Sequence, residues 1–250
     1  THKVKVHTFS TPVLDTDNYK ISELNPSLRD TLFSLFSSKP RTVEYNGVSV
    51  IDRGKYPSVW SPSIDTLVFS KYAEKLFYSK KIKRAVEIGT GSGFLSKYLL
   101  AKNKHLKSVL VNDLNPDAIR FAMENIKDKR ALFYAGSGIE KIKEEKHDLI
   151  ICNPPYIPRP KSIDDNPYEG IGLLYHLIHN GHNYLNKGGI FITNISSLCW
   201  DMVFNKKLTM KMTILGSLEV PLKVNNVMNN KKWLNYLIDN KLLMKKHKEG

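Results

Sequence analysis

Four consecutive residues in the second half of the chain, Asn153, Pro154, Pro155 and Tyr156, have the chemistry to hold a planar nitrogen group. They follow the apolar run 149–152, which is typical of a buried strand. Together they offer a side-chain carbonyl, a backbone carbonyl and an aromatic face. Pro155 restricts the backbone before it, so the Pro154 carbonyl has a set direction. An amide or an exocyclic amine fits this combination of groups.

A second candidate site is the glycine turn (residues 89–93), which follows the predicted strand 85–88 and opens a helix. Gly89, Gly91 and Gly93 let the backbone turn tightly and approach a ligand, and the helix N-terminus offers unpaired N–H groups. The spacing differs from the G-x-G-x-x-G of dinucleotide-binding dehydrogenases. The sequence contains no P-loop motif, which disfavours a P-loop nucleotidase. The alternative is a turn with a structural role only.

Asp113 stands at the end of the next predicted strand, 109–112. A carboxylate at this place can accept hydrogen bonds from both hydroxyls of a ribose. The alternative is a turn or cap residue ahead of Asn115 and Pro116. Together, the glycine turn and Asp113 predict a nucleoside cofactor that lies across the carboxyl edge of a sheet, with or without phosphates.

The elements that would position these groups alternate between strand and helix from residue 84 onward. Short apolar strands separated by helices predict an α/β fold with a mostly parallel sheet covered on both faces. The expected strands are 85–88, 109–112, 131–134, 148–152 and 190–195. One helix is expected to run from the glycine turn to about residue 102, and three more to span about 116–126, 172–185 and 230–240. Segments 210–215 and 219–224 are expected to pair as strands and to form an antiparallel C-terminal edge.

The first 56 residues are predicted to form a small N-terminal module of a helix and a hairpin. Asn25 and Pro26 begin the helix, and Asn46-Gly47 is a strong turn signal between the strands 42–45 and 48–51. A helix over 63–79 follows. We therefore divide the chain into residues 1–56, with a possible role in substrate recognition, and residues 57–250, which carry the candidate sites.

The charge of the chain points to a polyanionic partner. Lysine and arginine number 38 against 24 acidic residues, a net charge of +14, which suits RNA, DNA or the ribosome. The alternative is a solvated surface, because the lysines are spread along the chain. The chain has no run of about 18 apolar residues, so no membrane helix is predicted. The N-terminus lacks the apolar h-region of a secretory signal. Two cysteines in 250 residues disfavour a disulfide framework, so we expect a cytoplasmic protein.

Three motifs in order resemble the class I S-adenosylmethionine-dependent methyltransferases, which have a Rossmann-like fold. They are 86–93 with the glycine turn, Asn112-Asp113 ahead of a helix, and 148–156 with the Asn-Pro-Pro-Tyr motif. The match covers about residues 57–195. Within this class, residues 157–158, 169–175 and 59–66 resemble the HemK-type protein-glutamine N5-methyltransferases, which modify the Gly-Gly-Gln loop of release factors.

The resemblance implies S-adenosylmethionine as the cofactor and assigns residues to its parts. Where many relatives place an Asp that binds the adenine amine, this chain has Gly136-Ser137, so Ser137 or the backbone would serve. The methionine part of the cofactor would lie against the glycine turn, the ribose against Asp113, and the adenine against Leu114. These positions are Glu87, Gly89, Thr90, Gly91 and Gly93 for the methionine part, Asp113 for the ribose, and Leu114 for the adenine, with Asn153 close to the cofactor.

The same resemblance makes Asn153, Pro154 and Tyr156 the catalytic residues. Methyl transfer from a sulfonium is an in-line displacement, so the enzyme mainly positions and desolvates the reactants. The Asn153 side-chain oxygen and the Pro154 carbonyl would accept the two N–H groups of the target and return electron density to its nitrogen, while Tyr156 stacks on the planar group. The methylated nitrogen is acidic, so no dedicated His or Lys base is required.

Two other functions stay open at this point. The Asn-Pro-Pro-Tyr motif also occurs in N6-adenine methyltransferases of rRNA, tRNA and DNA, so the partner is either a protein such as a release factor or a nucleic acid. A non-catalytic binding subunit with a methyltransferase fold is the second alternative. The oligomeric state is not predicted.

Several other residues have simpler interpretations. His176, His179 and His182 span too wide an arc of their predicted helix for one metal ion, so no metal site is predicted. Trp60 either covers the cofactor or packs in the core. Trp200 and Trp233 are expected to pack, and Glu169 to be a charge on a loop.

Overall fold

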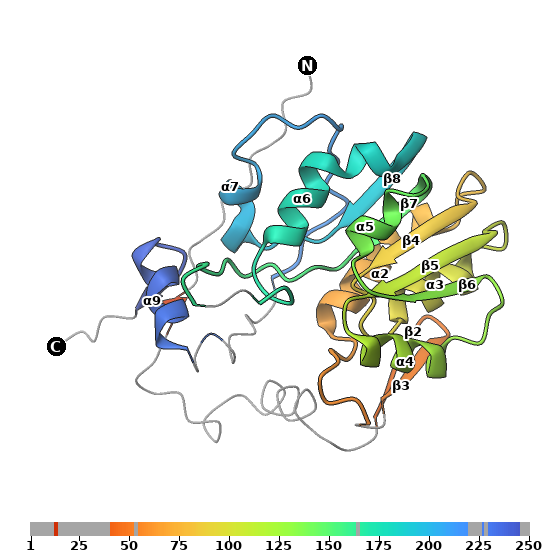
Figure 1. Ribbon diagram of the computed structural model, residues 1–250, viewed down its shortest axis with the longest axis horizontal. Helices are drawn as coiled ribbons and strands as arrows, with labels where there is room; N and C mark the ends of the chain where they lie inside the picture. Colours follow the sequence, from red (N-terminus) through yellow and green to blue (C-terminus); the bar gives the residue numbers. More distant parts are fainter. Residues whose placement is uncertain are drawn as a thin grey trace.

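A five-stranded parallel sheet in the order β6-β5-β4-β7-β8 forms the centre of the molecule (Figure 1). The structure, a computed structural model, describes residues 13–14, 41–52, 55–163, 166–219, 227 and 230–245. The strands are β4 (Arg84–Ile88), β5 (Ser108–Asp113), β6 (Ala131–Ala135), β7 (His147–Cys152) and β8 (Leu185–Thr193). The order and direction of these strands confirm the predicted α/β class.

Helices cover both faces of the sheet, because successive strand residues point to opposite sides. Ala85, Val109 and Ile151 belong to one buried cluster, and Val86 and Ile150 belong to the other. One face packs against α2 (Ile64–Phe77), α3 (Phe94–Lys102) and α4 (Pro116–Asn125), and the other against α5 (Gly138–Ile142), α6 (Gly172–Asn180) and the 3-10 helix η2 (Gly181–Tyr184). Burial on both faces explains why the strands read as nearly continuous apolar runs.

The predicted hairpin is present and packs on the α3 side of the sheet. β2 (Arg41–Tyr45) and β3 (Val48–Asp52) pair around Asn46 and Gly47, whose φ angles are 48° and 75°. Val48 and Val50 are buried with the core residues of α3, and Lys97 donates to the Ser49 carbonyl over 2.6 Å. The helix expected near residues 28–36 lies outside the described residues, and the boundary at residue 56 stays a prediction.

The C-terminal part of the chain forms a separate small cluster. The predicted closing helix is confirmed as α9 (Lys231–Asp239), and Trp233 is buried beside Leu198, Leu237 and Leu243. The short helices η3 (Ser197–Cys199) and α7 (Trp200–Val203) precede it. At the chain ends, β1 (Val13–Leu14) and β9 (Met244–Lys245) pair in parallel. Within the described ranges, every helix is too short or too polar to cross a membrane.

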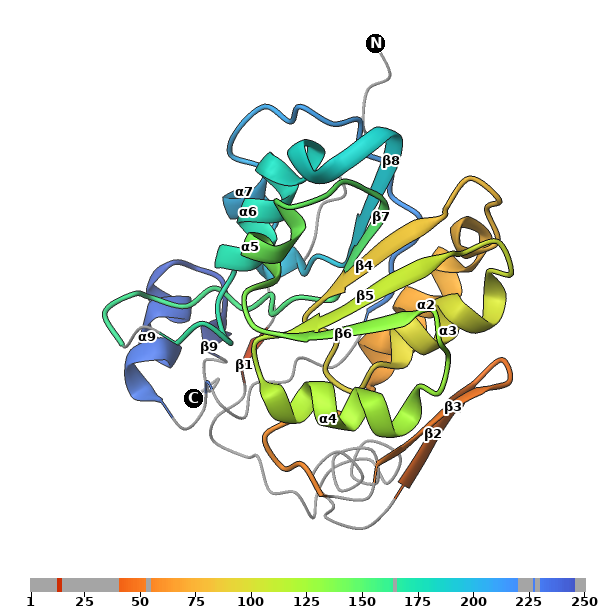
Figure 2. The ribbon, with the colours of Figure 1, turned by 45° about the vertical axis from the view of Figure 1, so that its right-hand side comes forward.

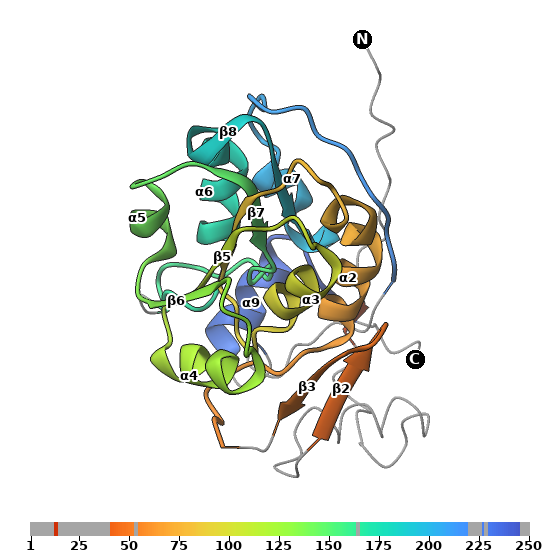
Figure 3. The same ribbon diagram turned by 90° about the vertical axis from the view of Figure 1, so that its right-hand side faces the viewer.

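The strand expected over residues 210–215, one half of the antiparallel C-terminal edge, is the main fold prediction that is wrong. Residues 211–219 contain no strand, and the second expected strand, 219–224, lies almost wholly outside the described residues. The segment instead runs beside α2 (Figure 3). A Cβ on Gly216 would overlap the Tyr72 ring of α2, and the Tyr72 hydroxyl donates to the Ser217 carbonyl over 3.3 Å. Contacts with α2 therefore take the place of strand pairing.

The last strand of the sheet also begins earlier than predicted. The Gly188-Gly189 pair, which precedes the strand expected at 190–195, lies inside β8. Gly188 has a φ of 78°, and the pairing with β7 shifts register between His147 and Leu149. A bulge at glycine lets the strand continue through this pair. The preceding helix correspondingly ends at Asn180 and continues as η2.

Candidate active site

The candidate residues meet at the carboxyl edge of the sheet because β4, β5 and β7 are neighbours that run in the same direction. Ile88 pairs with Asn112 on one side and with Cys152 on the other. The residues that follow these positions are the glycine turn, Asp113 and Asn153. Figure 2 shows β4, β5 and β7 running toward a common edge. Open α/β sheets bind ligands at such an edge.

The glycine turn is tied to the end of β5 by two hydrogen bonds that its backbone N–H groups donate. The Thr90 N–H donates to the Asn112 carbonyl over 2.8 Å, and the Gly91 N–H donates to Asp113 Oδ2 over 2.9 Å. Gly89, Gly91 and Gly93 have φ angles of 74°, 52° and 81°, a region that favours glycine. Nothing lies within 4 Å of the place where a Gly89 Cβ would stand. The turn is therefore rigidly placed and open on the Gly89 side.

Glu87 is a buried carboxylate directly beneath this turn. Its Oε2 accepts hydrogen bonds from the Thr90 hydroxyl over 2.8 Å, from the Ser96 N–H over 2.9 Å and from the Ser96 hydroxyl. Burial raises the pKa of Glu87 to about 7, against the opposing effect of these hydrogen bonds. A carboxylate with this pKa has its charge set by small changes in its surroundings.

Asp113 is held in one orientation by the backbone. Its Oδ1 accepts from the Asn115 N–H over 2.9 Å, while Oδ2 accepts from Gly91. Burial raises the pKa of Asp113, and the hydrogen bonds from Asn115 and Gly91 oppose that effect. A carboxylate has about four acceptor positions, so both oxygens retain capacity for a ligand. Leu114, the next residue, is 42% exposed at the same edge.

The short turn between β6 and α5 borders this region and contains Ser137. Ser137 begins α5, and its hydroxyl accepts from the Glu140 N–H over 3.3 Å. Asn112 is buried and donates from Nδ2 to the carbonyls of Tyr134 and Gly136, over 3.0 and 2.9 Å. Asn112 thereby fixes the β6 end next to the glycine turn, a role that the sequence interpretation missed.

The Asn-Pro-Pro-Tyr motif contacts the first turn of α2. Asn153 Nδ2 lies 3.5 Å from Thr66 Oγ1, and the Tyr156 hydroxyl donates to Asp65 Oδ2 over 3.0 Å. Burial, followed by the effect of Asp65, raises the pKa of Tyr156, which keeps its phenol protonated. Thr66 also accepts from the Ser63 N–H over 3.3 Å at the start of the helix. Asp65 and Thr66 had no assigned role, although they lie in the 59–66 stretch that carried part of the resemblance.

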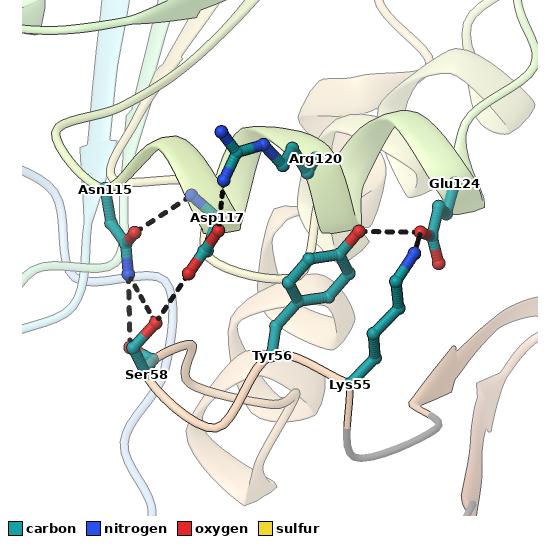
Figure 4. A network of polar contacts seen from close by, with 7 residues as sticks. All are labelled: Lys55, Tyr56, Ser58, Asn115, Asp117, Arg120 and Glu124. Atoms are coloured by element: carbon teal, nitrogen blue, oxygen red, sulfur yellow. Dashed lines mark hydrogen bonds and ion pairs between the residues drawn. The ribbon is translucent and has the colours of Figure 1, made fainter.

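The segment before α2 is fastened to α4 by a polar network (Figure 4). Asn115 Nδ2 donates to the Ser58 carbonyl over 3.2 Å, and Glu124 accepts from the Tyr56 hydroxyl over 2.7 Å and from Lys55 over 2.5 Å. These contacts hold the segment before α2 so that it passes beside the glycine turn. The Trp60 carbonyl lies 3.2 Å from the place of a Gly91 Cβ. Trp60 is 65% exposed, so its interpretation as a core residue is wrong.

The segment after the motif is fixed by contacts with the C-terminal cluster. Trp233 Nε1 donates to the Pro158 carbonyl over 2.7 Å. The Arg159 guanidinium lies 5.4 Å from the centre of the Trp233 ring, and its Nε lies 3.0 Å from Glu169 Oε2. The Glu169 side chain is only 21% exposed, so it forms a largely buried ion pair instead of the expected loop charge. Trp233 packs as predicted.

The three histidines of α6 and η2 lie apart from this edge. His176 Nε2 is 2.9 Å from the Tyr184 hydroxyl, and His179 Nε2 is 2.9 Å from the Val203 carbonyl. Among the described residues, no three His, Cys, Asp or Glu side chains cluster as a metal site. A cavity of about 300 Å³ lies between the sheet and α5, and its lining, which includes Arg84, Leu132 and His147, contains none of the candidate site residues.

Comparison with known families agrees with this fold. Residues 70–233 match the family described as Methyltransferase small domain. The chain belongs to this family of methyltransferases, a class that takes its methyl group from S-adenosylmethionine, and the expected enzyme class and cofactor are thereby confirmed.

Individual relatives give a finer description. The chain is 30% identical over 188 residues to a Methanocaldococcus jannaschii protein provisionally named protein N5-glutamine methyltransferase MJ0928, covering 70% of this chain and 92% of that protein. It is 30% identical over 149 residues to the release factor glutamine methyltransferase of Geobacter sulfurreducens, covering 53% of this chain and 51% of that protein. The chain thus spans about half the length of that second relative.

A solved structure of ribosomal protein L11 methylase from Lactobacillus delbrueckii resembles the chain at a TM-score of 0.47 and 17% identity. The overlap covers 70% of this chain and 93% of that chain.

Proposed function

We propose that this protein transfers the methyl group of S-adenosylmethionine to the side-chain nitrogen of a glutamine in a protein substrate. The observation that carries the proposal is the Asn153 amide, which directs Nδ2 toward Thr66 at the carboxyl edge of the sheet. Its Oδ1 is then available as an acceptor for the N–H of a target amide, close to the glycine turn.

The glycine turn and the two carboxylates suit the cofactor. The open space at Gly89 and the left-handed backbone there allow a ligand to approach the main chain. Asp113 would bind the ribose hydroxyls through the acceptor capacity that its two backbone hydrogen bonds leave. Glu87 and Thr90 would lie near the methionine part, Leu114 against the adenine, and Ser137 or the backbone beside it near the adenine amine. When bound, the cofactor supplies a methyl group on a cationic sulfur.

The residues of the motif would act on the target amide. An amide nitrogen is a weak nucleophile because its lone pair is shared with the carbonyl. Asn153 Oδ1 and the Pro154 carbonyl would accept its two N–H groups, which orients the lone pair and raises its electron density. Tyr156 would stack on the amide plane, and its hydrogen bond to Asp65 holds its hydroxyl in place. Positioning of this kind supplies much of the rate enhancement in reactions with a good leaving group.

Glutamine is favoured over adenine by the relatives. The Methanocaldococcus protein, named for N5-glutamine methylation, is covered over 92% of its length, and the Geobacter relative is named for release factors. We therefore propose a release factor or a similar translation protein as the substrate. Residues 1–56 would contribute to its recognition, and the reaction would take place in the cytoplasm. The N6-adenine alternative has no comparable support among these relatives.

Methyl transfer assays with labelled S-adenosylmethionine test the proposal. The protein is incubated in parallel with a release factor, with the same factor after Gln→Asn replacement in its Gly-Gly-Gln loop, and with bulk RNA. Label is expected in the intact factor only. Label that enters only the RNA would overturn the glutamine assignment in favour of adenine, and absence of cofactor binding by calorimetry would instead support a non-catalytic subunit.

A further inference from the structure

The turns that lead into the five parallel strands are rich in lysine. Because the strands all run in one direction, these turns lie together at the amino edge of the sheet, opposite the candidate active site (Figure 2). The lysines are Lys80, Lys81 and Lys83 before β4, Lys104 and Lys107 before β5, Lys129 before β6, Lys146 before β7 and Lys187 near the start of β8. All except Lys83 are exposed. Lysines spread along the sequence thus form one surface, which we call the basic edge.

The acidic groups near the basic edge already have partners. Glu145 pairs with Arg84 at 2.8 Å, and Asp128 pairs with Arg130 at 2.6 Å. Asp148 accepts from the backbone N–H groups of Lys83 and Arg84, over 2.9 and 3.0 Å. In the part of the chain that the structure describes, none of the lysines of the basic edge forms an ion pair with a carboxylate. The edge therefore carries a large uncompensated positive charge.

The dimensions and composition of this edge fit the phosphate backbone of RNA. Five strands spaced about 4.8 Å apart span about 19 Å, which allows contact with several successive phosphates. Tyr78, at the end of α2, is 52% exposed two residues before Lys80 and offers an aromatic face on which a base can stack. Protein interfaces have an apolar, charge-depleted centre. Among the exposed apolar side chains, Trp60 and Leu114 lie near the opposite edge, whereas Leu132, 52% exposed, is the second residue of β6 and lies beside the basic edge. One aliphatic side chain beside eight lysines does not make such a centre.

We propose that the basic edge binds single-stranded or looped RNA and serves as a tether, separate from the catalytic edge. Strands of five to six residues at about 3.3 Å per residue put roughly 17–20 Å between the two edges. RNA held at the basic edge therefore does not present its bases to Asn153. The positive charge and the Asn-Pro-Pro-Tyr motif thus serve two different partners, and the RNA site stands whether or not the glutamine proposal holds.

The test uses the full chain and a fluorescent mixed-sequence RNA oligonucleotide, with binding followed by anisotropy at several salt concentrations. The quadruple variant Lys81→Gln, Lys104→Gln, Lys146→Gln and Lys187→Gln removes one charge near the start of each of four strands, β4, β5, β7 and β8. The control variant Lys207→Gln, Lys211→Gln, Lys231→Gln and Lys232→Gln removes the same charge from exposed positions elsewhere. The negative slope of log affinity against log salt is expected to become shallower by about 3 in the first variant, since four phosphate contacts are lost and each contributes about 0.7. The control variant should change the slope by less than about 1.

Replacement of Tyr78 separates RNA from other polyanions. Tyr78→Ala should weaken RNA binding by about 10-fold with little change in the salt slope, and Tyr78→Phe should retain the affinity. Cofactor affinity and melting temperature should stay at wild-type values in all these variants. An equal loss in the two lysine variants would overturn the proposal, because it would mean diffuse charge attraction. Polyglutamate that competes as well as RNA of equal charge would also overturn it, in favour of an acidic protein.

Discussion

The Tyr156 hydroxyl donates a 3.0 Å hydrogen bond to Asp65, which lies 91 positions earlier in the chain. The neighbouring pair, Asn153 and Thr66, lies 3.5 Å apart. The first turn of α2 thus contacts the motif through two polar side chains. The site that we propose for the target amide is therefore built from two distant segments, and changes in either segment should alter the reaction.

Removal of the Asn153 amide tests its proposed role as an acceptor for the target amide. Asn153→Ala should lower the methyl transfer rate by at least about 100-fold, the usual cost of losing an acceptor or donor at a reacting group. Cofactor affinity should change less than about 3-fold, because the glycine turn and Asp113 stay intact. Isothermal titration calorimetry and a label-transfer assay measure the two quantities, and Asn183→Ala on the exposed side of η2 is a matched control. Loss of cofactor binding in Asn153→Ala would contradict the assigned role.

The hydrogen bond between Tyr156 and Asp65 can be measured as a coupling energy. Tyr156→Phe removes only the hydroxyl, and Asp65→Ala removes the acceptor along with the other contacts of that carboxylate. A double-mutant cycle on the rate of methyl transfer should give a coupling of about 1 kcal/mol, as for contacting polar pairs. Asp65→Asn keeps an acceptor oxygen and should retain more activity than Asp65→Ala. Additive effects of the two single changes would mean that the bond does not position the Tyr156 ring.

The buried Glu87 carboxyl should make stability depend on pH. Its pKa is raised from 4.5 to about 7 in the folded protein, so the native state binds the proton more tightly than the unfolded chain. The stability linked to this proton is complete below about pH 4.5 and is lost as the pH rises to about 7. We compare the unfolding free energies of Glu87→Gln and the wild type, measured by urea unfolding. The value for the variant minus the value for the wild type should therefore be larger at pH 8 than at pH 5. A difference that is constant with pH would contradict the raised pKa.

Two glycines of the turn should respond differently to alanine. Gly93→Ala places a Cβ 2.9 Å from the Ala122 Cβ at a φ of 81°, so it combines backbone strain with a clash between α3 and α4. We expect a loss of about 3 kcal/mol in unfolding free energy. Gly89→Ala meets open space at a φ of 74°, and about 1 kcal/mol is expected, with a clear loss of cofactor affinity. Equal stability losses, or unchanged cofactor affinity in Gly89→Ala, would contradict this account.

Local patterns determined most of the fold of the described residues. The five strands, the helices α2, α3, α4 and α9 and the hairpin at Asn46-Gly47 follow from apolar periodicity, helix caps and residues that tolerate positive φ. The glycine turn and the motif were also visible, because each depends on the backbone preferences of a few adjacent residues. The segment 210–215 has the apolar pattern of a strand, yet it forms none. Met210 packs against the cluster that contains Ile150 and Leu177, and the next residues, Gly216 and Ser217, contact Tyr72 of α2. Partners for a strand are supplied by distant residues, which the local pattern does not record.

Only the tertiary structure brought Asp65 and Thr66 to the motif, made Glu169 a partner of Arg159 and gathered scattered lysines at the basic edge. These relationships depend on the order and common direction of β4, β5, β6, β7 and β8. A sequence pattern records which face of an element is buried, because that depends on neighbouring positions. It does not record which element covers that face, because that contact joins residues far apart in the chain. The sequence therefore indicated the proposed roles of Asn153 and Tyr156 through their side-chain chemistry, and the packing of α2 decided which residues they contact.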